Sequence, residues 1–494
     1  MNGDLLTIAP LITVIVGALA VIVSDAITPA RRLPPIGIAL AFLGATAAQL
    51  LSRAGETNVA LGGAYVASPF VVYLGLLGIA IAAITLLVAP SFLAARKLPT
   101  AEFAATLLFA LAGAILVGAA GDLITLFVGL ELMVIPGYLL AGYAKRDPLS
   151  TEGAVKYFLL GSFSSAILLF GLVILWGSVG TASLDGIAFA LAAAPEGAAS
   201  PALAVALALI TTGVAFKIAA VPFHYWTPDA YQGSPTPITG YLSVGPKVGA
   251  FALMIKLFLV ALLPMASVWV PIIAVLAAAT MTLGNLVALT QTNVKRMLAY
   301  SSIAHTGYLM VGIVAAGSGD ASGVSAILFY AAAYAFMNLG AFAVLSAVGV
   351  SVGASSQLDA LSGLGRRHPF LALLATAFLL SLTGIPPTAG FFAKTAIILA
   401  AVQAGGTATL LAIVAVLNAA IAAFYYLRVV VYLFMRDPVG DQPEPASAPL
   451  LRLGLLLATL GTIALGLAPT PLRSEEHTSE LQSLAYLVCR LLLE

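Results

Sequence analysis

Long apolar stretches recur along nearly the whole chain, and short polar or Pro/Gly-rich breaks separate them. Each stretch reaches the ~20 residues that a helix needs to cross a bilayer. Only 8% of the 494 residues are charged, whereas a soluble domain carries about a quarter. The apolar runs are continuous rather than alternating, which excludes a transmembrane β-barrel. The sequence therefore predicts an all-α polytopic membrane protein.

The apolar stretches predict about fourteen transmembrane helices in a single compact domain over residues 1–472. The first stretch follows an acid and no basic residue, which is typical of a first span rather than of a cleaved signal peptide. The predicted spans lie near residues 5–27, 33–52, 69–90, 102–120, 122–143, 153–178, 201–222, 237–263, 268–290, 295–316, 322–348, 370–402, 407–434 and 450–468.

Basic residues gather in alternate loops and indicate the orientation. With the N-terminus outside, only Arg53 lies in an outward loop, so we expect both termini on the non-cytoplasmic side. The abundance of alanine favours a bacterial plasma (inner) membrane. The inward loops hold Arg31, Arg32, Arg96, Lys97, Lys145, Arg146, Lys295, Arg296, Arg366, Arg367, Arg436 and Arg452.

The last segment, RSEEHTSELQSLAYLVCRLLLE (Arg473–Glu494), differs from everything before it. It opens with a dense polar run, and RSEEHTSELQS resembles the translation of a common sequencing-library adapter. We therefore expect residues 473–494 to be a non-native tail, and we assign no role to Cys489 or His477.

The chain holds few residues that could bind a cofactor. Cys489 is its only cysteine, and an iron–sulfur cluster needs about four thiolates. No Gly-rich nucleotide fingerprint follows a strand pattern, and no cluster of His, Cys and acidic residues has the spacing of metal ligands. The net charge of +1 gives no reason to expect nucleic acid as a partner. We therefore expect this chain to bind no cofactor and no metal.

Four ionisable residues lie deep inside predicted spans, on four different helices. A charge at the centre of an inserted helix costs ~2.5–3.5 kcal/mol, which an apolar residue would avoid. Four such residues favour an ion pathway over the alternative, structural salt bridges. Burial disfavours the ammonium form of lysine and a nearby carboxylate favours it, so a moving carboxylate could switch a buried lysine. The four residues are Glu131, Lys217, Lys247 and Lys394.

Other polar residues in the spans have simpler explanations. His305 lies in the middle of its span, where a hydrogen-bonded packing histidine is more common than a proton carrier. Lys156 lies near the cytoplasmic end of its span and could snorkel to the interface. Snorkelling is also the expectation for Lys256 and Arg428, which lie nearer to span ends.

Two predicted spans carry prolines beside a lysine. Pro222 follows Lys217 in GVAFKIAAVPFHYWTPDAYQGSPTP (213–237), and a proline frees backbone carbonyls that must find protein or water inside a membrane. We expect the Lys217 amine to lie near those carbonyls. His224, just beyond the break, could continue a proton path towards the cytoplasm.

The second case is LTGIPPTAGFFAKTAII, in which Pro386 and Pro387 precede Lys394. Two interrupted helices with adjacent lysines indicate inverted repeats, which we place at spans four to eight and nine to thirteen. Spans seven and twelve are then discontinuous helices. The alternative is a pair of proline kinks that only ease packing.

Three motifs are specific enough to indicate a family. VPFHYWTPDAYQGSPTP (Val221–Pro237), AYSSIAHTGY (Ala299–Tyr308) and GIPPTAGFFAK (Gly384–Lys394) resemble the N subunit among the antiporter-like membrane subunits of proton-pumping NADH:quinone oxidoreductase, respiratory complex I. The resemblance covers residues 1–472. It implies a chain without redox centres, whose partner subunits bind NADH, FMN, iron–sulfur clusters and quinone.

The resemblance also implies roles for particular residues. Glu131 matches a span-five glutamate that pairs with a neighbouring lysine, and Lys217 matches the lysine of the first broken helix. Lys247 and His305 match residues that connect two half-channels. Lys394 matches the lysine of the second broken helix, on the outlet side.

The implied mechanism is a proton relay driven from elsewhere in the complex. Quinone reduction would perturb buried charges, reach Glu131 and change the proton affinity of Lys217. Lys156 has a counterpart in span six, which favours a functional role for it. Three alternatives remain at this stage: a subunit of a multisubunit cation/proton antiporter, a subunit of a membrane-bound hydrogenase complex, or a scaffold whose buried charges set helix register.

Overall fold

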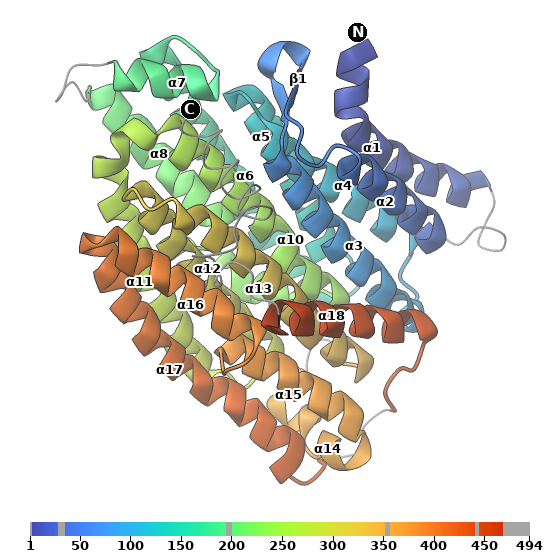
Figure 1. Ribbon diagram of the computed structural model, residues 1–494. Helices are drawn as coiled ribbons and strands as arrows, with labels where there is room; N and C mark the ends of the chain where they lie inside the picture. The colour runs from blue at the N-terminus through green and yellow to red at the C-terminus, as the bar shows by residue number, and fades with distance from the viewer. Residues whose placement is uncertain (1, 28–34, 194–199, 351–355, 440–443, 468–494) are drawn as a thin grey trace.

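The computed structural model describes residues 2–27, 35–193, 200–350, 356–439 and 444–467. Within these ranges the chain is almost entirely helical (Figure 1), and eleven helices are long and apolar enough to cross a membrane. The prediction of an all-α polytopic membrane protein is confirmed. The expected tail at residues 473–494, and the inward-loop residues Arg31 and Arg32, lie outside the described residues.

The described residues up to 261 form helices α1–α10 and a short hairpin. The hairpin, β1 (Asn58–Ala60) and β2 (Tyr65–Ala67), is antiparallel and was not predicted from the sequence. Helix α7 lies across one end of the bundle (Figure 1). The helices are α1 (Asn2–Ile27), α2 (Pro35–Leu51), α3 (Pro69–Ala95), α4 (Ala101–Ala119), α5 (Leu123–Ala141), α6 (Pro148–Val179), α7 (Leu184–Ala192), α8 (Pro201–Lys217), α9 (Trp226–Gly233) and α10 (Thr236–Met254), which continues as a π-helical segment, Ile255–Ala261.

The second half repeats the pattern of long helices with short connections. Its helices are α11 (Ala266–Thr290), α12 (Val294–Gly317), α13 (Ser322–Ala347), α14 (Leu364–Arg367), α15 (Pro369–Thr383), α16 (Ala389–Ala404), α17 (Gly406–Met435) and α18 (Pro449–Leu467). Most predicted span boundaries agree with these helices to within a few residues.

Local sequence signals fix where several helices begin. Asp122, Asp147 and Asn293 accept hydrogen bonds of 2.7, 2.9 and 3.0 Å from backbone N–H groups in the first turns of α5, α6 and α12. Such caps satisfy donors that a helix N-terminus leaves free. Pro148 and Pro201 occupy first-turn positions, where a missing N–H costs no hydrogen bond.

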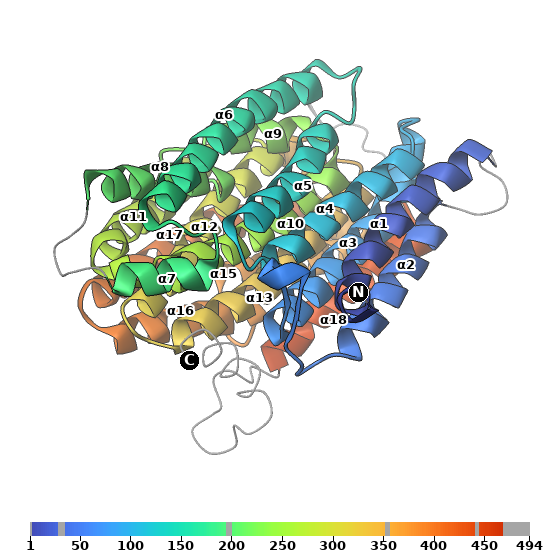
Figure 2. The same ribbon diagram turned by 90° about the horizontal axis from the view of Figure 1, so that it is seen from above.

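The core runs through the middle of the bundle. Helices α10, α12 and α13 are buried along most of their length, whereas α1, α6 and α18 leave many apolar side chains exposed. Figure 2 shows α1 and α2 at one edge of the molecule and α11 and α17 towards the other. Phe163 and Phe170 on α6 are exposed, as expected of a surface that faces lipid or another subunit. The predicted proton carriers on α10 and α12 therefore lie at the centre.

The helical path is interrupted at both proline-containing segments. Helix α8 ends at Lys217, and residues 218–225 are non-helical before α9 begins. Ala219 in this segment has a φ of 60°, a conformation that costs a non-glycine residue about 1–2 kcal/mol. Helix α15 ends at Thr383, Gly384 follows with a φ of 89°, and α16 begins at Ala389. The predicted span 370–402 is thus two helices, and Lys217 is the last residue of its helix rather than a mid-span residue.

Candidate functional site

At the first break, Lys217 and Glu131 form an ion pair with a hydroxyl between them. The Lys217 Nζ lies 3.6 Å from Glu131 Oε1, and the two side chains are 2% and 22% exposed. Ser165 on α6 accepts a hydrogen bond of 2.6 Å from Lys217 and donates one of 2.6 Å to Glu131. A hydroxyl both donates and accepts, so one side chain suffices to pass a proton between amine and carboxylate.

The Lys217 amine does not lie against the carbonyls freed by the break, so that expectation was wrong. Side chains of a helix point back towards its N-terminus, and this amine turns to α5 and α6. It donates to the Gly161 carbonyl at 3.3 Å and to the Tyr138 hydroxyl at 3.4 Å. Gly161 permits this approach, because an added Cβ would come within 2.2 Å of the Tyr138 hydroxyl.

Other side chains satisfy the carbonyls at the first break. Thr306 on α12 donates to the Ile218 carbonyl at 2.8 Å, and the Trp226 indole N–H donates to the Phe216 carbonyl at 3.2 Å. Unpaired backbone groups are costly at membrane depth. The break therefore persists because side chains of α9 and α12 replace the missing helical hydrogen bonds.

Lys247 lies in the middle of α10 and is held by α12. Its Nζ donates to both the carbonyl and the hydroxyl of Ser302, the latter at 2.7 Å. The ring of Tyr334 on α13 has its centroid 5.4 Å from Nζ, within range of a cation–π contact. The amine is thus surrounded by neutral polar groups and an aromatic face.

His305 follows Ser302 by one turn of α12 and is 2% exposed. Its Nδ1 lies 2.6 Å from the Tyr330 hydroxyl, and its Nε2 lies 3.2 Å from the Tyr426 hydroxyl. Its ring also contacts that of Tyr334, with centroids 4.8 Å apart. Both ring nitrogens therefore have hydroxyl partners, which suits a packed histidine and a proton carrier alike.

Lys394 on α16 is the lysine that binds the carbonyls of a broken helix. Its Nζ donates to the Thr383 carbonyl at 2.7 Å and to the Leu382 carbonyl at 3.1 Å. The Tyr308 ring lies 5.0 Å from this Nζ, and the rings of Tyr308 and His305 have centroids 5.9 Å apart. Tyr308 therefore contacts both His305 and Lys394, as Tyr334 contacts both His305 and Lys247.

Lys156 lies at the surface rather than among the buried lysines. Its side chain is 43% exposed and pairs with Glu152 at 2.6 Å and with Asp229 at 2.7 Å. Arg296 on α12 binds the second oxygen of Asp229 at 2.6 Å. Burial raises the pKa of the Asp229 carboxyl, and the two cations lower it by more, so its pKa lies below the usual value. Asp229 thus joins α6, α9 and α12 on the side of the first break.

His224 lies within the first break and is 4% exposed. Its ring stacks on Tyr225 with centroids 4.7 Å apart and meets Tyr300 at 6.4 Å. Among the residues that the structure describes, its Nδ1 has no hydrogen-bond partner. Its role in proton entry stays a prediction.

Two residues expected to snorkel make contacts within the protein. Lys256 lies in the π-helical segment after α10, is 9% exposed, and has its Nζ 6.0 Å from the centre of the Phe70 ring. Arg428 on α17 donates to the carbonyls of Leu289 and Gln291 at 2.7 and 2.6 Å. The snorkelling expectation was wrong for Lys256, because neighbouring helices cover it. For Arg428, which is partly buried and caps the C-terminal end of α11, it stays a prediction.

Several contacts of the site were not predicted. Ser165 and Tyr138 touch the first lysine, and an isolated serine or tyrosine in a span gives no signal in the sequence. Tyr330 and Tyr334 both face His305 from α13. Their spacing of four residues places them on one helix face, which is the signal that could have identified them.

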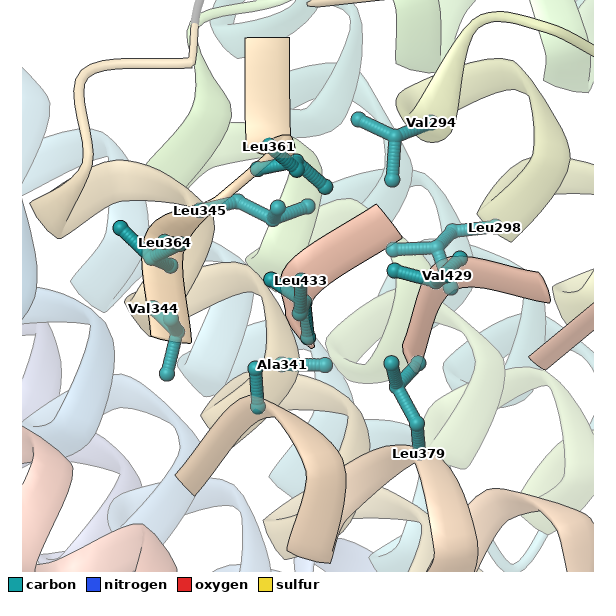
Figure 3. Close-up of a pocket in the computed structure, with 11 residues that line it drawn as sticks. Val294, Leu298, Ala341, Val344, Leu345, Leu361, Leu364, Leu379, Val429 and Leu433 are labelled. Atoms are coloured by element: carbon teal, nitrogen blue, oxygen red, sulfur yellow. The ribbon is translucent and has the colours of Figure 1, made fainter. Parts of the chain in front are cut away.

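The site is distinct from the pocket that Figure 3 shows. That pocket lies between α12, α13, α15 and α17, and its lining is entirely aliphatic, with Leu298, Val344 and Leu433 among the residues drawn. It offers no group that can carry a proton. Across the described ranges, no group of three or more His, Cys, Asp or Glu residues is placed to hold a metal ion.

Buried lysines beside interrupted helices, inside a polytopic bundle, define the class of antiporter-like membrane proteins. Residues 120–421 match the family described as NADH:quinone oxidoreductase/Mrp antiporter, TM. The chain is 44% identical over 398 residues to NADH-quinone oxidoreductase subunit N 1 of Sorangium cellulosum, covering 78% of each chain. The chain therefore belongs to this family, and within it to the NADH-quinone oxidoreductase N subunits.

Solved structures agree with this assignment. The chain is similar to one of respiratory complex I from Thermus thermophilus, solved with bound aureothin, with a TM-score of 0.77, 33% identity, and coverage of 93% of this chain and 97% of that one. It is also similar to a chain of the Mrp complex from Dietzia, with a TM-score of 0.81 and coverage of 100% and 98%. At 24% identity, the second likeness shows the fold alone.

Proposed function

We propose that protons cross the membrane through this subunit of NADH:quinone oxidoreductase along its buried lysines. The observation that carries the proposal is a chain of contacts among buried residues: Tyr334 contacts both Lys247 and His305, and Tyr308 contacts both His305 and Lys394. At the first break, Lys217 faces Glu131 through one serine hydroxyl. Ionisable groups inside a membrane are costly, and they mark ion pathways.

The residues of this chain hold and move the proton. The energy for moving it comes from redox chemistry in other subunits, which use NADH, FMN, iron–sulfur clusters and quinone. Quinone reduction shifts charge near Glu131, and the changed carboxylate alters the proton affinity of Lys217. The proton passes by way of Lys247 and His305 to Lys394, and Lys217 reloads from the cytoplasm. Each elementary charge moved against 100 mV costs ~2.3 kcal/mol, which redox chemistry supplies.

In this scheme the prolines keep both breaks open and two further residues serve proton entry. Pro222, Pro386 and Pro387 cannot donate the hydrogen bonds of a continuous helix. His224 lies within the first break, next to the cytoplasmic side. Lys156 belongs to the surface cluster with Asp229, beside the same break, and is placed to collect protons there.

The two breaks occupy equivalent places in a pair of inverted repeats, α4–α10 and α11–α17. Helix α4 packs on α5 as α11 packs on α12, and the interrupted spans, α8 and α15–α16, come fourth in each unit. A count of fourteen spans is supported, within the described residues, by the eleven long helices together with α2, α8 and the α15–α16 pair.

We place the chain in a bacterial plasma (inner) membrane with both termini on the non-cytoplasmic side, because its basic residues gather in the loops that would face the cytoplasm. Arg96, Lys145 and Arg366 lie in inward loops and support this placement. Lys295 does not contribute to the charge bias, because it is fully buried and donates to the Ser234 carbonyl.

The test compares membranes that carry Lys217→Ala with wild-type membranes. With assembly of the complex confirmed, we expect NADH:quinone turnover and the proton gradient to fall together. Lys145→Ala is the matched control, because Lys145 is exposed in a loop, and it should leave both quantities unchanged. Wild-type turnover and gradient in Lys217→Ala membranes would mean that Lys217 is a structural charge and that the relay is wrong.

A further inference from the structure

The hydroxyl of Thr306 lies between the two lysine sites of the first half of the path. Thr306 is fully buried on α12. Its Oγ1 lies 2.8 Å from the Ile218 carbonyl and 3.2 Å from the Ser302 carbonyl. Ile218 directly follows Lys217 at the first break, and the Ser302 carbonyl is an acceptor of Lys247.

A threonine hydroxyl carries a single hydrogen, so it cannot donate fully to two carbonyls at once. In the present arrangement the shorter bond goes to Ile218, while the Lys247 amine occupies the Ser302 carbonyl. An ionised amine is a stronger donor than a neutral one, because charge-assisted hydrogen bonds are roughly twice as strong as neutral ones. The state of Lys247 therefore determines how strongly Ser302 competes for the Thr306 hydrogen.

We propose that Thr306 is a positioning residue that links the protonation of Lys247 to the first helix break. With Lys247 charged and bound to Ser302, the Thr306 hydrogen stays on the Ile218 carbonyl and fixes the end of α8. After Lys247 passes its proton on, the hydroxyl turns to Ser302, and the Ile218 carbonyl is released. The hydrogen remains on Thr306 throughout, so no bond to it is made or broken. This inference rests on the proposed function.

Thr280 on α11 provides an internal control at the same break. It is fully buried like Thr306, and it accepts a hydrogen bond of 3.0 Å from the Val221 N–H. Its hydroxyl donates to the Leu276 carbonyl of its own helix and touches neither lysine site. A substitution at Thr280 therefore loosens the break without touching the link to Lys247.

The first test measures turnover in assembled complexes that carry Thr306→Val or Thr306→Ser. Valine keeps the shape and removes the hydroxyl, so we expect NADH:quinone turnover to fall about fivefold, the equivalent of one hydrogen bond. Serine keeps the hydroxyl, and Thr306→Ser should stay near the wild-type rate. A wild-type rate in Thr306→Val, or an equal loss in both variants, would overturn the proposal.

The second test measures amide hydrogen exchange of residues 218–225 in the complex, and it does not depend on turnover. Lys247→Met removes the competing amine, so exchange in this segment should rise relative to wild type. In a Thr306→Val background, adding Lys247→Met should cause no such rise in exchange. In a Thr280→Val background, adding Lys247→Met should still cause it. Unchanged exchange in Lys247→Met, or a rise of equal size in both backgrounds, would overturn the link.

Different results would contradict the proposed proton relay and the proposed role of Thr306. If Lys217→Ala leaves pumping intact, the proposed relay is wrong whatever Thr306 does. If Lys217→Ala abolishes pumping while Thr306→Val does not slow it, the relay stands and only the role of Thr306 is wrong.

Discussion

The two helix breaks look alike in sequence, but their lysines are used differently. At the first break, Lys217 turns away from the freed carbonyls and faces Glu131 through a serine hydroxyl. At the second, Lys394 itself donates to the carbonyls of Leu382 and Thr383. No ion pair of Lys394 with an acid occurs within the described part of the chain.

The difference implies that Lys217 is controlled by a nearby charge, whereas Lys394 is coupled directly to the backbone at its break. The charge of Lys217 depends on an acid on another helix, so movement of α5 or α6 can change it without disturbing the broken backbone. The amine of Lys394 is part of the backbone's own hydrogen bonding, so a change in its charge acts directly on the end of α15. Within the proposed relay, the first break is therefore suited to responding to a change at Glu131, and the second to converting a proton transfer at Lys394 into a local movement.

The largest effect should come from Lys394→Met. It removes a carrier of the proposed relay and also leaves two buried carbonyls without their donor, at a cost of about 1–3 kcal/mol for each unpaired group. We expect pumping to be lost and the thermal stability of the complex to fall. Lys217→Met should abolish pumping with a smaller loss of stability, because threonine and tryptophan cap its break and because Glu131, which is 22% exposed, keeps the Ser165 hydroxyl as a donor.

Lys394→Arg sharpens this prediction. Arginine can donate to both carbonyls but stays protonated, so it should recover stability without recovering the proton gradient. Thermal unfolding and gradient formation would be measured on the same preparations. Equal stability of the methionine variants at positions 394 and 217 would contradict the distinction between the two breaks.

Glu131→Gln and Ser165→Ala test electrostatic control at the first break. Glutamine removes the charge that faces Lys217, and we expect coupled turnover to fall about 100-fold, the lower end of what a positioned proton-transfer group contributes in enzymes. Ser165→Ala should have a smaller effect than Glu131→Gln, and Ser165→Thr should retain most activity because it keeps a hydroxyl. Turnover and gradient are the measurements, and a larger effect at Ser165 than at Glu131 would reverse the assigned roles.

The sequence predicted the spans well because hydropathy is a local property. The span predicted near 322–348 is helix Ser322–Ala347, and that predicted near 268–290 is Ala266–Thr290. The depths of Lys247 and Lys394 were also predictable, because distance from a span end is counted along the chain. Both lysines are indeed buried, at 5% and 6% exposure.

The direction of a side chain was not predictable in the same way. Lys217 and Lys394 stand beside similar proline motifs, yet one is the last residue of its helix and the other lies inside the helix that follows its break. Lys256 was expected at the interface, but α3 and α7 cover its segment. Such outcomes depend on which helices pack together, and a single sequence contains no direct signal for that.

A further difference between the breaks is the ion-pair cluster around Asp229, which ties α9 to α6 and α12. Because the pKa of folded Asp229 is lowered, its contribution to stability is present above the unfolded pKa of about 3.9 and is lost as pH falls through the folded pKa. We expect Asp229→Asn to be less stable than wild type at neutral pH, and the two unfolding temperatures to converge as pH falls below about 4. A difference that stays constant with pH would show that the charge of Asp229 is not the stabilising feature.

The smallest effect should come from Lys256→Met, which tests whether burial alone makes a lysine functional. Lys256 is buried like the lysines of the proposed relay, but within the described residues its ammonium has no hydrogen bond or ion pair. It lies 6.0 Å from the centre of the Phe70 ring, and Asp185 on α7 acts on it only through longer-range electrostatics. Replacing a buried charge by an apolar residue of similar size is often neutral or stabilising. We therefore expect wild-type turnover and an unchanged or higher unfolding temperature. A loss of pumping comparable to that of Lys217→Met would show that burial without a hydrogen-bonded partner is enough to make a lysine functional. The hydrogen-bond partners at the two breaks would then not distinguish functional lysines from structural ones.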